Sequence, residues 1–202
     1  MHATPSPPST FQTLLASAAG GMALPEWPRV ARALEVRRIE PGGTAFMQGV
    51  EHPYVYAVDS GLLKLSYLGE DGTEWIKSFA HEGRFFASIA ALAPGGRTSF
   101  MVTAIEPSVL ERIDYRLLAA LAREHLAWAT ALHALTLVFA ARKEEREREL
   151  LTLDAEGRYR AFCGAQPELA ARIPQKDLAR HLGVTPVGLN RIVMRVRRAQ
   201  GA

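Results

Sequence analysis

Hydrophobic and polar positions alternate in short runs through the first half of the chain. Within residues 63–67, leucine or tyrosine alternates with lysine or serine, and Asp71-Gly72 then turns the chain into residues 73–79. This pattern predicts a β-hairpin. Similar runs, separated by turns that contain glycine or proline, extend from about Leu34 to Ile113. Several strands at this spacing predict an antiparallel β-roll, barrel or sandwich.

The pattern changes from strand to helix at about Tyr115. Apolar residues then recur at intervals of 4, 3 and 4, on one stripe of a helix: Trp128, Leu132, Leu135 and Phe139. A helix from roughly residue 124 to residue 152 would be about 40 Å long. One small β domain does not cover that length, so the stripe predicts pairing with a second copy of the chain. Packing against the β domain alone is the alternative.

Residues 173–198 predict a helix-turn-helix. Pro174 suits the first turn of one helix, and Gly183 suits the tight turn that ends it. Thr185 is a good N-cap for a second helix whose first residue is Pro186. An earlier helix is expected to begin after Asp154, which is also a good N-cap.

The second helix of this motif has two different sides. At 100° per residue one side is apolar: Leu189, Ile192, Val193 and Val196. The other side carries Val187, Met194 and the three arginines Arg191, Arg195 and Arg198, with no acid. Arginine can donate two hydrogen bonds to guanine O6 and N7 in the major groove, so this side predicts binding to double-stranded DNA. The candidate DNA-binding residues are Gln175, Thr185, Pro186, Val187, Asn190, Arg191, Arg195 and Arg198. A capped helical hairpin that merely closes a bundle is the alternative.

The charge distribution agrees with a polyanionic partner. Residues 1–140 hold 11 basic and 13 acidic residues, whereas residues 141–202 hold 13 and 8, so the net charges are −2 and +5. Cys163 is the single cysteine, which excludes an intramolecular disulfide and a cluster held by four thiolates of one chain. Residues 126–141 are too short an apolar stretch for a membrane span. We expect a cytoplasmic protein without a membrane partner.

Signatures of catalysis and of metal binding are missing from the sequence. It contains no His-x-His pair with a following carboxylate, no Gly-x-Ser-x-Gly elbow and no phosphate-cradling glycine-rich loop with lysine. We expect no enzyme activity, no metal site and no cofactor. His52, His81, His125 and His133 are conceivable haem ligands, but no pair of them has a ligand-like setting.

The order of these elements resembles the Crp/Fnr family of transcription regulators. The resemblance covers about residues 30–200 and includes LDAEGRYRAF at residues 153–162 and LARHLGVTPVGLNRI at residues 178–192. A motif of one branch is also present: Glu70-Asp71-Gly72, Glu74, Lys77-Ser78-Phe79, Glu82-Gly83 and Phe85-Phe86. The resemblance implies a homodimeric DNA-binding regulator with a cyclic-nucleotide-binding-like roll, and RNA polymerase as a further partner if it activates. A ligand-binding roll without DNA-regulatory activity is the alternative.

The sequence departs from the family's pattern in the recognition helix and in the nucleotide-binding pocket of the roll. Where the best-known members have Arg, Glu and Arg in the recognition helix, this chain has Pro186, Val187 and Arg191, so a different operator is expected. We expect a domain without the family's wing, because only residues 199–202 follow Arg198 in this sequence. In the roll, Ala87-Ser88-Ile89 replaces the nucleotide-binding Gly-Glu-Leu. The possible effector pocket is Ser88, Arg97, Thr98 and Ser99, with the arginine one place early. We therefore expect another effector than cyclic AMP, or none.

The predicted fold class is α+β, with four segments. Residues 1–23 form a disordered or loosely ordered N-terminal segment, and residues 24–122 form the antiparallel β-roll of the jelly-roll type. Residues 123–153 form the dimerisation helix. Residues 154–202 form an all-α helix-turn-helix domain.

Overall fold

The computed structural model describes residues 9–200. The chain divides into two compact units, which are described separately. Of the described residues, the first unit contains 9–65 and 79–138, and the second contains 66–78 and 139–200. The long helix α5 (Leu126–Thr152) contributes residues to both units.

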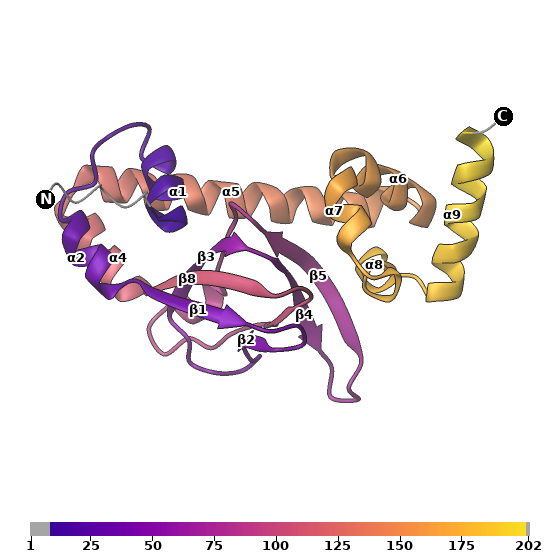
Figure 1. The fold of residues 1–202 in the computed structure, drawn as a ribbon, viewed down its shortest axis with the longest axis horizontal. Helices are drawn as coiled ribbons and strands as arrows, with labels where there is room; N and C mark the ends of the chain where they lie inside the picture. The colour runs from indigo at the N-terminus through magenta and orange to yellow at the C-terminus, as the bar shows by residue number, and fades with distance from the viewer. Residues whose placement is uncertain (1–8, 201–202) are drawn as a thin grey trace, which may run out of the picture. The chain divides into compact units, whose positions relative to one another are not determined.

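The β-roll consists of two four-stranded sheets (Figure 1). The first has the order β1-β8-β3-β6 and the second has the order β2-β7-β4-β5. The strands are β1 (Glu35–Ile39), β2 (Thr44–Phe46), β3 (Tyr54–Ser60), β4 (Leu62–Leu68), β5 (Glu74–His81), β6 (Phe85–Phe86), β7 (Met101–Ala104) and β8 (Ser108–Asp114). The pairs β1–β8, β3–β8, β3–β6 and β2–β7 are antiparallel. The predicted antiparallel roll is confirmed.

The predicted hairpin joins β4 to β5. Gly69 N donates to Thr73 O at 2.9 Å, and Thr73 N donates to Asp71 Oδ1 at 2.9 Å. Gly72 has a φ of 80°, a conformation that favours glycine. At Gly69 a Cβ atom would lie 2.8 Å from the Trp75 ring, so the indole can pack there only against a glycine.

The core of the roll is built from residues of both sheets. Tyr56 of β3 stacks on Phe86 of β6 with ring centroids 4.8 Å apart. Val58, Leu63 and Leu110 are fully buried beside them. The alternation seen in the sequence matches core and surface at residues 63–65 but not beyond, since Ser66 is buried and Tyr67 is exposed. Burial of the apolar side chains supplies the main stabilisation of the roll.

Residues 10–18 correct the expectation of a loosely ordered N-terminal segment. They form helix α1 (Thr10–Ala18), which is followed by α2 (Trp27–Ala33). Phe11 and Leu15, four residues apart on one helical face, are fully buried, and the Phe11 ring lies 4.9 Å from the Phe85 ring. This apolar pair explains why the segment is helical. Residues 1–8 of the same expectation lie outside the described residues.

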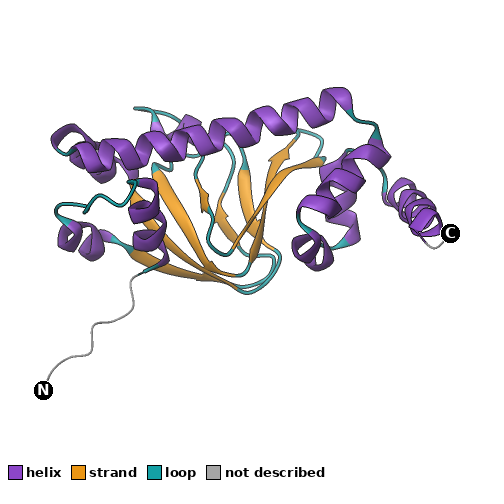
Figure 2. Ribbon diagram, turned by 90° about the horizontal axis from the view of Figure 1, so that it is seen from above, coloured by secondary structure: helices purple, strands orange, loops and turns teal. Residues whose placement is uncertain are grey.

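Helix α5 is one unbroken helix (Figure 2), preceded by α3 (Ile89–Leu92) and α4 (Tyr115–Glu124). Its apolar residues lie in different surroundings, both inside and outside the predicted stripe. Trp128 is buried, stacks on Trp27 and donates to Pro25 O at 2.8 Å. Leu137 and Val138 instead expose 56% and 43% of their surfaces. Within residues 9–200, no helix combines the length and the apolarity that crossing a membrane requires.

The helices of the second unit after α5 are α6 (Ala155–Ala165), α7 (Pro167–Arg172), α8 (Gln175–Leu182) and α9 (Pro186–Gln200). Asp154 caps α6, since its Oδ1 accepts from Gly157 N at 2.7 Å. Pro174 occupies the N-cap position of α8 rather than its first turn, a shift of one residue from the prediction. The predicted order of roll, long helix and helix-turn-helix is confirmed.

Candidate nucleic-acid interface

The turn between α8 and α9 has the predicted caps at both sides. Gly183 has a φ of 70°, and Val184 N donates back to Ala179 O at 3.0 Å, which closes α8. Thr185 Oγ1 accepts from Gly188 N at 3.1 Å, which opens α9. A Cβ atom at Gly188 would lie 3.2 Å from Thr185 Oγ1. Glycine at position 188 therefore leaves room for the cap.

Two arginines that the sequence did not single out hold this turn in place. Arg146 of α5 donates to His181 O. Arg158 of α6 donates to Leu182 O at 3.1 Å and to Leu153 O at 2.6 Å. Both cations thus meet carbonyls at the C-terminus of α8, where the helix dipole is negative. The turn is therefore fixed by side chains from α5 and α6.

His181 is buried next to the same turn. Its Nδ1 donates to Ile76 O at 3.2 Å, and its ring lies 5.2 Å from the Phe162 ring. Burial, together with a smaller effect of the neighbouring Arg146 charge, lowers the pKa of His181 to about 4. His181 is therefore neutral near pH 7.

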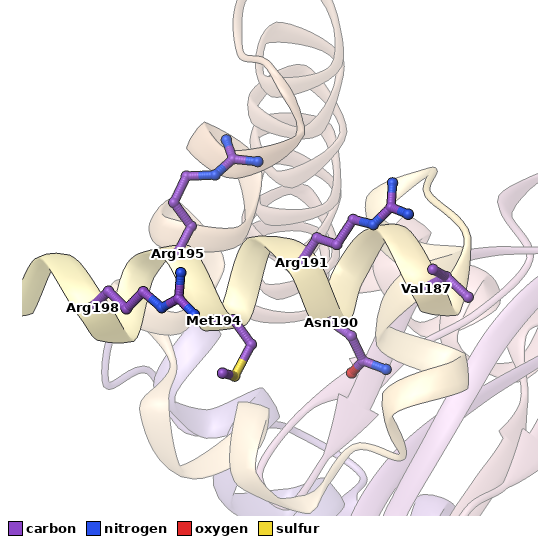
Figure 3. Close-up of a pocket in the computed structure, with 6 residues that line it drawn as sticks. All are labelled: Val187, Asn190, Arg191, Met194, Arg195 and Arg198. Atoms are coloured by element: carbon purple, nitrogen blue, oxygen red, sulfur yellow. The ribbon is translucent and has the colours of Figure 1, made fainter.

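The two sides of α9 differ as predicted. Leu189, Ile192, Val193 and Val196 are buried. The opposite side is open to solvent and forms a hollow of about 490 Å³ (Figure 3). Its lining is Val187, Asn190, Arg191, Met194, Arg195 and Arg198. The structure thus brings together five of the eight predicted DNA-binding residues and adds Met194.

Of the other three predicted residues, two lie at the start of α9 and one lies away from the arginine face. Thr185 and Pro186 are exposed at the N-terminus of α9. Gln175, at the start of α8, does not line the hollow of about 490 Å³ and instead lines a second hollow beside another face of α9. Gln175 therefore stands apart from the arginine face.

The arginines of the exposed side differ in their partners. Arg195 forms an ion pair with Glu156 of α6, with Nη1 and Oε2 2.9 Å apart, and Glu156 also pairs with Arg160 at 2.8 Å. Within residues 9–200, Arg191 and Arg198 form no ion pair. Glu156 is 39 residues from Arg195, so no local pattern could have revealed this contact.

The possible effector residues of the roll are held by the fold itself. Ser88 is buried, and its Oγ accepts from Ser99 N at 3.0 Å. Thr98 is buried too, donates to Met47 O at 2.6 Å and accepts from Val50 N at 3.0 Å. Arg97 is exposed and donates to Gly49 O at 2.7 Å. These bonds tie the 47–50 loop and the 88–99 segment together.

One cluster of potential metal ligands was not predicted. The ligand atoms of Glu26, Glu124 and His125 lie within 4.8 Å of one another. Glu26 pairs with His125 Nε2 at 3.1 Å and with Arg29 at 3.1 Å, and these two contacts lower the pKa of its carboxyl group. The hydrogen bond between Glu26 and His125 accounts for the closeness of these two residues.

Comparisons with known proteins bear on both parts of the chain. Residues 36–125 match the family model of the cyclic nucleotide-binding domain. Sequence comparison with curated proteins gives no match.

Solved structures of transcription regulators share the fold. FixK2 from Bradyrhizobium japonicum is 20% identical, with 83% of this chain and 86% of that chain covered and a TM-score of 0.73. The c-di-GMP-responsive regulator CLP of Xanthomonas campestris is 18% identical, with 86% and 91% covered and a TM-score of 0.68. A regulator from Eubacterium rectale, described as Crp/Fnr family, is 13% identical, with 89% and 86% covered and a TM-score of 0.69.

Proposed function

Because the chain carries a cyclic nucleotide-binding domain and has the Crp/Fnr fold, we propose that it is a sequence-specific DNA-binding transcription regulator rather than an enzyme. It acts as a homodimer on a two-fold operator. RNA polymerase is its further partner if it activates transcription.

The observation that carries this proposal is the exposed side of α9. Three arginines and one asparagine line its hollow, and no carboxylate does. The helix start is exposed, and the N–H of Val187 is available there to an anion, because Pro186 has no N–H and Gly188 N is bonded to Thr185. A helix with a basic exposed side and a buried apolar side fits the major groove of B-DNA.

The side chains of this face have distinct roles in the proposal. Arg191 donates two bonds to guanine O6 and N7, Asn190 pairs with adenine N6 and N7, and Val187 contacts a thymine methyl group. Val187 is suited to that contact because 61% of its surface is exposed.

The contacts to phosphate come from the two ends of α9. Thr185 Oγ1 already accepts from Gly188 N, which leaves its hydroxyl hydrogen to donate to a phosphate oxygen. Arg198 meets a phosphate directly. Arg195 does so by exchanging Glu156 for the phosphate, so part of its binding energy is offset by the lost ion pair.

The proposed dimer forms through α5. Leu137 and Val138 are apolar and largely exposed on this helix, although Trp128 is already covered by its own chain. Burying such side chains against a second copy removes apolar surface from water. A two-fold dimer places two α9 helices at half-sites about one helical turn of DNA apart.

The proposed effector is a molecule other than cyclic AMP, or there is none. Ser88 and Thr98 are buried and hydrogen-bonded within the roll, and Arg97 is bonded to Gly49 O. CLP, which shares the fold, is c-di-GMP-responsive, so a Crp/Fnr-type regulator can respond to something other than cyclic AMP.

The test is selection of bound fragments from a random pool of duplex DNA. We expect enrichment of a two-fold related sequence. Arg191→Ala should abolish the enrichment or change the base at one position of each half-site. Arg197→Ala, on the same helix but outside the arginine face, is the matched control and should select the parent site. Absence of any enriched sequence would favour the ligand-binding roll without DNA-regulatory activity.

A further inference from the structure

A second hollow lies within the helix-turn-helix domain, between α6, α7, α8 and α9. Its volume is about 380 Å³, within the range of about 300–1,000 Å³ that ligand sites occupy. It is reached from a different face of α9 than the arginine face, since the two linings share no residue. This hollow therefore has no role in the proposed contacts to DNA bases.

One part of the wall of this hollow is formed by buried apolar side chains. Ile173, Leu178, Leu189 and Val193 line it and are buried. Ala170 of α7 also lines the hollow, and its side chain is small. Apolar walls of this kind accept a hydrocarbon or aromatic group of a ligand.

The polar part of the lining consists of Tyr159, Cys163, Gln175 and Arg197. Arg197 is the single charged residue in the lining, and no carboxylate accompanies it. Within the described chain Arg197 forms no ion pair. The Tyr159 hydroxyl and the Cys163 thiol also face the hollow, and burial raises the pKa of both groups, so both are neutral donors near pH 7. A free cation beside apolar walls is complementary to an anion with an apolar body.

We propose that this hollow binds a small amphipathic carboxylate. The apolar part of the ligand packs against Ile173, Leu178 and Val193, and its carboxylate accepts hydrogen bonds from the Arg197 guanidinium.

Occupancy of the hollow would affect α9 directly. The ligand touches α6, α8 and α9 together, so it favours one arrangement of these helices. The coupling to DNA rests on the proposed function, because α9 is the helix proposed to read DNA. Ligand binding itself does not rest on it, so the two are measured separately.

Cys163 provides a reporter inside the site, because it is the single cysteine of the chain. The probe is 3-phenylpropionate, and its uncharged counterpart 3-phenylpropanol is the control. The measurement is the rate at which the neutral reagent N-ethylmaleimide alkylates Cys163. At about twice its dissociation constant, the carboxylate should slow alkylation about threefold and in a saturable manner. Equal protection by the alcohol, or no saturable protection by the carboxylate, overturns the proposal.

Two matched variants locate the site. Arg197→Gln should abolish protection by 3-phenylpropionate, whereas Arg198→Gln, the next residue and part of the arginine face, should retain it. Ala170→Phe should also abolish protection because its ring fills the hollow. Circular dichroism of each variant establishes that it is folded. Parent-like protection in folded Arg197→Gln contradicts the proposed carboxylate contact.

The DNA readout uses the same probe at the same concentration. A change in affinity for the selected DNA site supports the coupling, and unchanged affinity despite saturable protection of Cys163 overturns the coupling. If the protein selects no DNA site, the proposed function fails while Cys163 protection still decides whether the hollow binds its ligand.

Discussion

The exposed side of α9 and the possible effector region of the roll contain the same kinds of residue, arginines with short polar side chains, but use them differently. On α9, Asn190, Arg191 and Arg198 line an open hollow. In the roll, Ser88 and Thr98 are buried and form hydrogen bonds with neighbouring backbone groups. The polar atoms on the exposed side of α9 are available to a partner, whereas those of Ser88 and Thr98 in the roll already form hydrogen bonds within the protein.

This difference matters because a hydrogen bond that is already formed must be broken before its atoms can bind a ligand. A ligand that recruited Thr98 would take it from Met47 O or Val50 N, and each lost bond would offset about 0.5–1.5 kcal/mol of the binding free energy. A phosphate that met Arg198 would displace only water. The comparison therefore favours DNA over a cyclic nucleotide as the partner.

The largest expected effect is loss of the dimer. Leu137→Glu should give a monomer of 22.1 kDa at micromolar concentration, because a carboxylate would be buried in the proposed interface. A single half-site should then bind DNA about 10²–10⁴-fold more weakly than two linked half-sites. Sedimentation and DNA titration measure the two effects.

Thr136→Glu is the control for this variant, because Thr136 is exposed on another side of α5 and its hydroxyl bonds only Leu132 O within the helix. It should remain dimeric. A parent protein that is already monomeric at micromolar concentration would contradict the proposed assembly. Leu135→Glu, suggested by the stripe in the sequence, is the weaker test because Leu135 is only half-exposed.

Arg191→Ala should reduce the free energy of DNA binding by about 1–3 kcal/mol per half-site, because a bidentate contact to guanine is lost. It should also relax the base preference at that base pair. Arg198→Ala should weaken selected and scrambled sites alike and lower the salt slope by about one unit per contact. Arg195→Ala should resemble Arg198→Ala with a smaller loss, since Glu156 already neutralises that arginine. Titrations at several salt concentrations separate these cases. Equal loss for both DNA sites in Arg191→Ala would mean that the helix is placed wrongly by about a turn.

His181 should make the second unit sensitive to acid. The pKa of its imidazole is about 4 in the folded chain, against an ordinary value of 6.5. Between these values the unfolded chain binds a proton that the folded chain does not, so stability falls as the pH decreases from 6.5 to 4. The loss should reach about 2 kcal/mol between pH 7 and pH 5.

The measurement is urea unfolding of the parent and of His181→Asn, whose amide can still donate to Ile76 O. The pKa of His52 is also lowered to about 4, mainly by burial, but His52 is present in both proteins and cancels in the comparison. The variant should lose less stability than the parent between the two pH values. An NMR titration that gave His181 an ordinary pKa would exclude this explanation without using the variant.

The sequence predicts well what depends on local pattern. The β4–β5 hairpin follows from alternation and Asp71-Gly72, and the caps at Gly183 and Thr185 follow from glycine and threonine beside apolar helical runs. Each of these features involves residues a few positions apart, so periodicity and cap chemistry are sufficient to find them.

The sequence fails where contacts join distant segments. Phe11 is buried because it reaches Phe85 and its N–H donates to Glu111 Oε2, neither of which a polar, proline-rich N-terminus reveals. Trp128 is taken out of the predicted stripe by Trp27, about 100 residues earlier. Glu156 meets Arg195 across two helices. Such pairs depend on how the elements pack, which periodicity does not encode.

Cyclic AMP should have no effect on the stability of the protein or on its affinity for DNA. A ligand present at 100 times its dissociation constant stabilises the state that binds it by about 2.7 kcal/mol. In this roll, however, Ser88 already holds Ser99 N, and Arg97 holds Gly49 O where a phosphate would need it. Millimolar cyclic AMP should therefore leave both the melting temperature and the affinity for the selected DNA site unchanged. A clear rise in melting temperature would mean that the bonds of Thr98 and Arg97 rearrange readily, and the contrast between the roll and α9 would no longer hold.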